Sequence, residues 1–341
     1  MQILTHLANK MKKSQAFGAY IMLVLLVIIN LLIQGKGFAN VSSINSLFLV
    51  NTPLILATVA QAVMIFCGGI DLSIGATISV VNAIVAGQHV PVPIAWLGAF
   101  LIAVLLGAAK GGIVAYLRVP PILVTFAIST LLEGLALLIL PKPGGSIPSS
   151  IYSVYGGVFA GFIPISALVI VLVLIGFGIV NRRPLGAQIK AAGENQRSLF
   201  IAGVNVERTK LKAYIISGVI TGIAGLCLTA LASSGDPKIG NALSLNSIAA
   251  AILGGVDLSG GWGTVGGAAA GALFLGVVNN VIFYVFNNVI HSSTLMGIKL
   301  SYLQQLLTNI IIILGLSSSL LAHLKKGQKR RKQANEIKNV G

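Results

Sequence analysis

Residues 22–33 read MLVLLVIINLLI, an apolar run interrupted only by Asn30. The run lacks the alternation of apolar and polar residues that is typical of a membrane β-barrel strand, and it therefore predicts a helix. Inside a bilayer only helices and closed barrels satisfy all of their backbone polar groups, so a long apolar helix of this kind favours a helical membrane protein.

The composition of the whole chain supports the same conclusion. Of its 341 residues, 56% are apolar and 9% are charged, and the mean hydropathy is +0.95. These values do not fit a water-soluble domain. Because the hydrocarbon core of a bilayer is about 30 Å thick, this length allows roughly ten spans. We therefore expect an all-α membrane protein of about ten transmembrane helices.

Apolar segments recur along the chain between short polar connections. Two of them are short for a full crossing, so we expect tilted, broken or re-entrant helices there. The short ones are 74–86 and 243–256. The complete set of predicted segments is 17–34, 47–66, 74–86, 94–117, 122–140, 165–180, 211–231, 243–256, 265–290 and 300–321.

Lysine and arginine cluster before the first segment, near the end of the fourth at Lys110 and Arg118, after the sixth and after the tenth. Cytoplasmic loops are enriched in these residues, and because an even number of predicted spans separates each cluster from the next, all four fall on one side of the membrane. This predicts a cytoplasmic N-terminus (1–16), a membrane domain (17–321) with a cytoplasmic loop at 181–212, and a basic cytoplasmic tail (322–341). A cleaved signal is the alternative for the first segment, although its apolar run exceeds the usual length for a signal.

A short motif occurs twice between apolar runs. Residues 68–75 read GGIDLSIG and residues 254–260 read GGVDLSG. Glycine pairs followed by an aspartate predict paired helix breaks, with each aspartate as the N-cap of a new helix. A direct contact with a transported substrate is the alternative. The residues predicted at the breaks are Gly69, Asp71, Ser73, Gly75, Gly255, Asp257 and Ser259.

Other polar side chains lie in or beside the apolar segments. Glu133 has no cation within one helical turn, and an unpaired acid in a span costs about 2.5–3.5 kcal/mol on insertion scales. It therefore faces a wet cavity, pairs with a distant cation or lies near an interface. Neutral amides suit a polar pathway, and hydrogen bonds between helices are their alternative role. The pathway candidates are Gln61, Asn82, Glu133, Asn246, Asn279 and Asn280.

The loop at 181–212 is the least apolar interior stretch. Asn195 can cap a short helix that ends near Ala202, and Gly203 can take the left-handed conformation that stops it. Such an amphipathic helix either lies on the lipid surface or inserts into a groove on a cytoplasmic partner. The side chains it presents are Gln196, Arg197, Leu199, Phe200 and Ile201.

Three stretches resemble one family: residues 69–75, 185–206 and 250–267. They are similar to the permeases of bacterial ABC importers of the ribose, xylose, galactose and autoinducer-2 family, and the similarity covers residues 62–280. Two departures stand in the loop. This chain has Gly186-Ala187 where the family usually has Gly-Arg, and Ser198-Leu199-Phe200 where it often has Ala-Ala-Arg.

The resemblance implies a monosaccharide pathway in the bacterial plasma (inner) membrane, formed by two permease chains that are either identical or related. It also implies an extracytoplasmic sugar-binding protein and a cytoplasmic ABC ATPase. The ATPase would bind a coupling helix. The residues implied in coupling are Glu194, Asn195, Gln196, Arg197, Leu199, Phe200, Gly203 and Asn205.

The chain has no motif of its own for hydrolysing ATP. The pattern Gly-x-x-x-x-Gly-Lys-Ser/Thr does not occur in it, so ATP and Mg²⁺ are expected in the partner ATPase. We expect no catalytic residue, no cofactor and no metal site in this chain. The net charge of +16 is interpreted as membrane topology and contact with anionic lipid, not as nucleic-acid binding, because few aromatic residues accompany the basic clusters.

Other kinds of transporter remain as alternatives. An ion-coupled secondary transporter normally carries several ionisable residues within its spans. A channel normally carries a ring of like charges or a filter motif. Within ABC importers, permeases for nucleosides or branched-chain amino acids are the nearest alternatives.

Overall fold

The computed structural model describes residues 16–288 and, beyond them, 294–295, 298–299, 302, 306, 309–310 and 313. Residues 1–15 of the predicted N-terminal segment, the predicted tail at 322–341 and most of the last predicted segment at 300–321 lie outside the described residues. The chain divides into two compact units, Met1–Val277 and Val278–Gly341. Apart from the second half of the helix Val265–Asn288, which carries Asn279 and Asn280, the elements that form the site below belong to the first unit.

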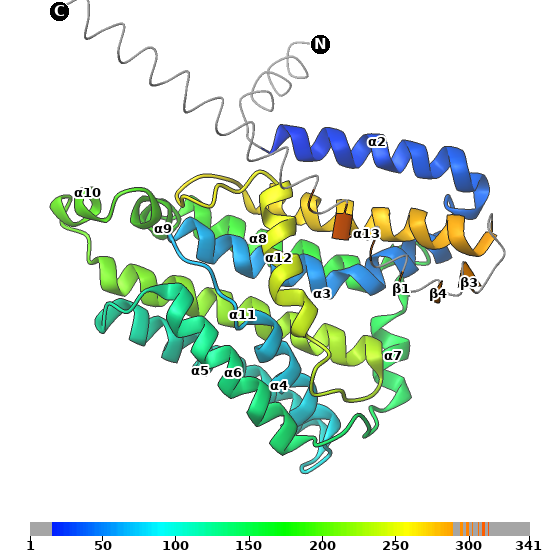
Figure 1. Cartoon of the computed structure of the whole chain (residues 1–341), viewed down its shortest axis with the longest axis horizontal. Helices are drawn as coiled ribbons and strands as arrows, with labels where there is room; N and C mark the ends of the chain where they lie inside the picture. The colour runs from blue at the N-terminus through cyan, green and yellow to red at the C-terminus, as the bar shows by residue number, and fades with distance from the viewer. Residues whose placement is uncertain are drawn as a thin grey trace, which may run out of the picture. The chain divides into compact units, whose positions relative to one another are not determined.

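Helices account for nearly all of the described structure (Figure 1). Each predicted apolar segment from 17–34 to 265–290 coincides with one of them. Two short antiparallel hairpins are also present, β1 (Val158–Phe159) with β2 (Ile163–Pro164) and β3 (Thr294–Leu295) with β4 (Ile298–Lys299). The helices are α2 (Phe17–Gln34), the 3-10 turn η1 (Gly35–Gly37), α3 (Val41–Phe66), α4 (Ile74–Ala86), α5 (Val92–Tyr116), α6 (Pro121–Ile139), α7 (Ser149–Tyr155), α8 (Ile165–Arg182), α9 (Pro184–Glu194), α10 (Gln196–Ile201), α11 (Val206–Ala232), α12 (Asn241–Leu253) and α13 (Val265–Asn288).

Among the described residues, 7 helices are long and apolar enough to cross a membrane. They are α2, α3, α5, α6, α8, α11 and α13. Helices α4 and α12 have 13 residues each, which gives them a length of about 20 Å against a hydrocarbon core of about 30 Å. The prediction that these two segments are too short for a full crossing is confirmed.

Helix α3 forms the centre of the first unit, and 89% of its most apolar 18-residue stretch is buried. Helix α11 packs against α5, α3 and α4, and its backbone comes close to α5 where Gly218 faces Gly107. Small residues of this kind allow close packing in a membrane, where apolar side chains gain little from leaving lipid. In α2 only 11% of the corresponding 18-residue stretch is buried. This helix exposes large apolar side chains such as Leu32, as expected for a lipid-facing helix.

Candidate coupling site and helix breaks

The loop between α8 and α11 folds into two helices, α9 and α10, separated only by Asn195. The Asn195 side chain accepts a hydrogen bond from the backbone N–H of Ser198 (3.0 Å) and so satisfies a free amide at the start of α10. Helix α10 ends at Ile201, and Gly203 has a φ of 76°, in the left-handed region. The predicted cap and the predicted stop are both confirmed.

One side of α10 is apolar and open. Phe200 is 71% exposed and Ile201 is 76% exposed, whereas Leu199 is only 6% exposed. The expectation that α10 presents Leu199 is therefore wrong, because this side chain is buried against its own chain. Phe200 and Ile201 form the available apolar surface.

A groove of about 430 Å³ lies beside α10, and the turn between α5 and α6 forms its other wall. Arg118 and Phe200 both line it. Lys210 Nζ donates a hydrogen bond to Gln196 Oε1 (3.0 Å), and the Arg118 guanidinium lies 3.6 Å from the Glu207 carboxylate. From the sequence, Arg118 is assigned only to a basic cluster that indicates membrane topology, because nothing in its spacing shows that it lies next to α10.

The remaining predicted coupling residues lie at the edges of this region. Glu194 is exposed at the end of α9. The Asn205 side chain accepts a hydrogen bond from the N–H of Arg208 (2.7 Å) and so caps α11. Its observed contact is therefore structural.

The first predicted helix break lies between α3 and α4 and contains a buried ion pair. Lys110 Nζ lies 2.7 Å from Asp71 Oδ2, and the two side chains are 3% and 1% exposed. The other carboxylate oxygen of Asp71 accepts hydrogen bonds from Ser73 N (2.8 Å) and Ser73 Oγ (2.6 Å). Lys110 Nζ also donates to Ser73 Oγ (2.8 Å). A buried network of charged and hydroxyl groups therefore stabilises the backbone of this break.

Two predictions about this network are corrected. The N-cap of α4 is Ser73, not Asp71, whose carboxylate accepts the amide only two residues further on and forms a local turn. Lys110 does not belong to a cytoplasmic basic cluster, because its side chain is buried against Asp71. A buried carboxylate requires an opposite charge or several donors, and α5 supplies that charge.

Side chains from two other helices satisfy the backbone at the break. With its amide oriented to satisfy both groups, Gln61 of α3 donates to the carbonyl of Asp71 (2.9 Å) and accepts from its N–H (3.2 Å). Thr125 of α6 donates to the carbonyl of Ile70 (3.1 Å) and accepts from the N–H of Leu72 (3.2 Å). Non-helical backbone within a membrane domain is tolerated when its polar groups are paired, as each of these groups is.

The second break, between α12 and α13, repeats the local geometry of the first. Asp257 Oδ1 accepts a hydrogen bond from Ser259 N (2.9 Å), as Asp71 does from Ser73. The helices before the two breaks end alike, with Gly68 at a φ of 79° and Gly255 at 81°. In both, the amide of the following residue bonds to the carbonyl five residues earlier at 3.0 Å, a typical glycine C-cap. Asp257 differs from Asp71 in being half-buried. The prediction that Asp257 is the N-cap of the next helix is wrong, because α13 begins only at Val265.

The two short helices meet at their N-terminal ends. Gly75 N donates to Ser244 Oγ (2.9 Å), and that hydroxyl donates to the carbonyl of Leu72 (2.8 Å). Gly240 N donates to Ser79 Oγ (2.9 Å). Gly75 and Gly240 face each other so closely that a Cβ on either would overlap the carbonyl oxygen of the other. The predicted break residue Gly75 is therefore a packing residue between α4 and α12.

Two of the predicted pathway amides have structural partners. Gln61 bonds to the Asp71 backbone as described above. Asn82 is completely buried; its amide donates to Thr229 Oγ1 (3.2 Å) and to the carbonyl of Ser234 (3.1 Å). Asn82 Oδ1 accepts from the N–H of Asp236 (2.8 Å). Asn82 therefore fixes the connection that leads from α11 to α12.

The other pathway candidates are less enclosed. Glu133 on α6 and Asn246 on α12 are half-buried, and neither side chain forms a hydrogen bond or an ion pair with another described residue. On α13, Asn279 is exposed and Asn280 is half-buried. Their role in a pathway stays a prediction, and it is strongest for Glu133 and Asn246, whose polar groups are available to a ligand.

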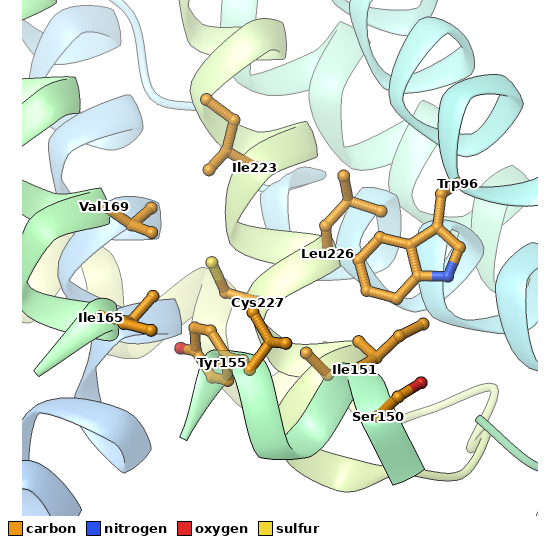
Figure 2. Close-up of a pocket in the computed structure, with 11 residues that line it drawn as sticks. Trp96, Ser150, Ile151, Tyr155, Ile165, Val169, Ile223, Leu226 and Cys227 are labelled. Carbon is orange, nitrogen blue, oxygen red and sulfur yellow. The ribbon is translucent and has the colours of Figure 1, made fainter. Parts of the chain in front are cut away.

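A cavity of about 440 Å³ lies among α5, α7, α8 and α11. Figure 2 shows that carbon dominates its lining, with Trp96, Tyr155 and Cys227 around it. The Tyr155 hydroxyl already donates to the carbonyl of Leu49 (3.3 Å). A ligand rich in hydroxyl groups needs several convergent polar partners, so this cavity does not fit such a ligand.

Comparison with known proteins relates the whole arrangement to transport. The family model described as the branched-chain amino acid transport system, permease component, matches residues 43–316. The ribose import permease of Haemophilus influenzae is 30% identical over 272 residues, which are 77% of this chain and 84% of that protein. The autoinducer 2 import system permease of an Enterobacter species is 31% identical over 253 residues, 72% of this chain and 73% of that protein.

A third relative, the D-allose transport system permease of Escherichia coli, is 30% identical over 278 residues, or 77% of this chain and 82% of that protein. No solved structure matches the chain. The matched region contains both helix breaks and the helices α9 and α10. The chain therefore belongs to the family of ABC importer permeases that includes these sugar permeases.

Proposed function

We propose that this chain is the transmembrane permease subunit of an ATP-binding-cassette importer that brings a monosaccharide into the cell. The observation that carries the proposal is the similarity, over most of the chain, to permeases named for ribose and D-allose. An L-arabinose permease of Azospirillum brasilense, 28% identical over 77% of this chain, supports a sugar in the same way.

Helix α10 is the docking element for the ATPase in this proposal. It exposes Phe200 and Ile201, and its capped start holds it in one orientation. Aromatic residues, Phe among them, are enriched at protein interfaces relative to the rest of the surface, so an exposed Phe200 suits a docking surface. ATP and Mg²⁺ bind to the ATPase, and this chain supplies the moving pathway.

The assembly in this proposal contains a second permease chain, either a copy or a relative, and an extracytoplasmic sugar-binding protein. It lies in the bacterial plasma (inner) membrane with both termini in the cytoplasm. The arginines and lysines from the end of α8 to the start of α11, such as Arg197 and Arg208, support a cytoplasmic location for α9 and α10.

The sugar passes polar groups that the fold leaves available. Glu133 and Asn246 are half-buried on helices of the membrane domain and make no hydrogen bond with other described residues. A carboxylate and an amide accept and donate hydrogen bonds to hydroxyl groups. In this proposal the two breaks give the pathway its shape, since their own polar groups are paired within the chain.

A branched-chain amino acid is the second candidate for the substrate. The description of the matching family model favours it, whereas the individual relatives named above favour a sugar. The binding protein decides between the two, because it delivers the substrate to the permease.

Reconstitution in vesicles tests the function. The chain is combined with its ATPase and its binding protein, and the uptake of radiolabelled ribose, allose and leucine is measured with and without ATP. We expect sugar uptake that requires ATP and both partners. Uptake by the chain alone, driven by an ion gradient, would falsify the proposal, and ATP-dependent uptake of leucine alone would replace the sugar by an amino acid.

A further inference from the structure

Helix α9 contacts both helix breaks at a single glycine. Gly193 lies in the last turn of α9, and a Cβ at this position would lie 2.8 Å from Gly68 N in the first break and 2.9 Å from Gly261 N in the second. The same Cβ would overlap the carbonyl oxygen of Phe66. No side chain larger than hydrogen fits between the two breaks here.

The two breaks approach Gly193 from their own sides and also contact each other. A Cβ on Gly68 would lie 3.1 Å from Gly193 Cα, and one on Gly260 would lie 2.9 Å from its carbonyl oxygen. Gly261 N donates a hydrogen bond to the carbonyl of Phe66 (3.1 Å). Backbone from α9, from the end of α3 and from the loop before α13 therefore meets at one point.

A second residue of α9, one turn earlier, contacts the same two breaks. Lys190 Nζ donates a hydrogen bond to the carbonyl of Gly263 (3.2 Å) in the second break. The same ammonium lies 5.3 Å from the centre of the Phe66 ring, at the first break. Partial burial lowers the pKa of Lys190, which agrees with an amine that is enclosed by both segments.

Helix α9 is tightly joined to the coupling helix. Only Asn195 separates α9 from α10; its N–H bonds to the carbonyl of Ala191 (2.9 Å) and its carbonyl accepts from Leu199 N (3.2 Å). A displacement of α10 therefore moves α9, since no flexible linker lies between them. On the other side, the first break leads into α4 and is joined to α5 by the Asp71–Lys110 pair, and the second break leads into α13.

We propose that Gly193 is the positioning residue through which α9 holds both helix breaks, so that one movement of α10 shifts the two breaks together. This inference rests on the proposed function, because it assigns a path from the ATPase to the membrane helices. A single contact point, at Gly193, then holds both breaks. Packed backbone transmits a displacement well because it has little room to deform.

The test substitutes Gly193→Ala in the full transporter. An alanine favours a helix more than a glycine does, so a purely local role predicts a neutral or stabilising change. A role between the breaks predicts overpacking that separates them. Gly178→Ala is the matched control, since it is a helical glycine in α8 with no atom within 4 Å of an added Cβ.

Two measurements on these variants are expected to differ. Uptake driven by ATP should fall about tenfold or more in Gly193→Ala, while ATPase co-purification and the basal rate of ATP hydrolysis stay near the wild type. Hydrogen exchange of the permease should rise at residues 67–73 and at 257–263 together. The Gly178→Ala variant should change neither uptake nor exchange.

Uptake within twofold of the wild type, or faster exchange at only one of the two breaks, would overturn the inference. Should Gly193→Ala fail to assemble, Lys190→Met provides the same test, because it keeps the aliphatic stem and removes the bond to Gly263. Unchanged exchange at either break in Lys190→Met then overturns the inference. Retained ATPase binding after Phe200 and Ile201 are both replaced by serine would count against the proposed docking role of α10, and it would leave the contact at Gly193 to be tested by exchange alone.

Discussion

Lys110 Nζ lies 2.7 Å from Asp71 Oδ2, and both side chains are almost completely buried. The pair joins α5 to the break between α3 and α4. In surroundings of low dielectric, each charge is tolerated only because the other is present. Ser73 extends the network, since it donates to Asp71 and accepts from Lys110.

Removing one charge of this pair should strongly destabilise the chain. We expect Lys110→Met to lower the free energy of unfolding by about 3–5 kcal/mol, because Asp71 is then buried without a counter-charge. The double variant Lys110→Met with Asp71→Asn should recover much of this loss. Thermal unfolding of the purified chain in lipid nanodiscs measures all four members of the cycle. Strictly additive effects of the two substitutions would contradict a direct pair.

The exposed surface of α10 should matter for assembly and not for folding. Replacing Phe200 and Ile201 together by serine should weaken binding of the partner ATPase by tenfold or more, which is about 1.4 kcal/mol or more, and leave thermal stability unchanged. Phe162→Ser is the control, because Phe162 is 64% exposed in the β1–β2 hairpin and lies outside α10. Co-purification of the ATPase with each variant provides the measurement, and equal recovery from both variants would remove α10 from the interface.

A substitution of Leu199 examines the buried side of α10. Because it is 6% exposed, Leu199→Ala should destabilise the α9–α10 region by about 2 kcal/mol or more, and any loss of ATPase binding should follow from that. Hydrogen exchange at residues 195–205 separates the two effects. Slow, native-like exchange together with lost binding would mean that Leu199 contacts the partner directly.

Features that depend only on residues close together in the chain, such as helix positions, caps and breaks, were predicted well from the sequence. Apolar length alone located the spanning helices and showed that α4 and α12 are short. The cap at Asn195 and the stop at Gly203 followed from side-chain and backbone preferences that act within a few residues. The repeated Gly-Gly motif predicted both breaks for the same reason, since a glycine C-cap depends on the residues next to it.

Contacts between distant segments were not predictable in this way. Lys110 sits near the end of a span, where a lysine also fits a cytoplasmic loop, and only the packing of α5 against α4 shows its partner. Asp71 was assigned as an N-cap because it follows a glycine pair and precedes a new apolar run, yet its charged partner, Lys110, comes from another helix. The meeting of both breaks at Gly193 depends on three segments far apart in the chain, and one sequence carries no signal for it.

Asn82 should be essential for the connection after α11. Its amide group makes three hydrogen bonds, to Thr229, Ser234 and Asp236, and Asn82→Leu leaves several buried polar groups unsatisfied at about 1–3 kcal/mol each. We expect lower thermal stability and faster hydrogen exchange at residues 233–240. The control Asn246→Leu should have little effect on stability, because Asn246 makes no hydrogen bond with another described residue. Equal destabilisation by the two variants would show that the bonds of Asn82 contribute little.

The contact between α4 and α12 should tolerate no side chain at Gly75. An alanine Cβ there would overlap the carbonyl oxygen of Gly240 and lie 2.6 Å from Ser244 Oγ. The backbone of one helix must then move, so Gly75→Ala should destabilise the chain by about 1–3 kcal/mol despite the better helix propensity of alanine. Gly98→Ala in α5, where no atom lies within 4 Å of the added Cβ, should be neutral or slightly stabilising. Thermal unfolding of both variants compares them directly. If Gly75→Ala is as stable as Gly98→Ala, the two short helices are not held together at this point, and the hydrogen bond from Gly75 N to Ser244 Oγ loses its structural role as well.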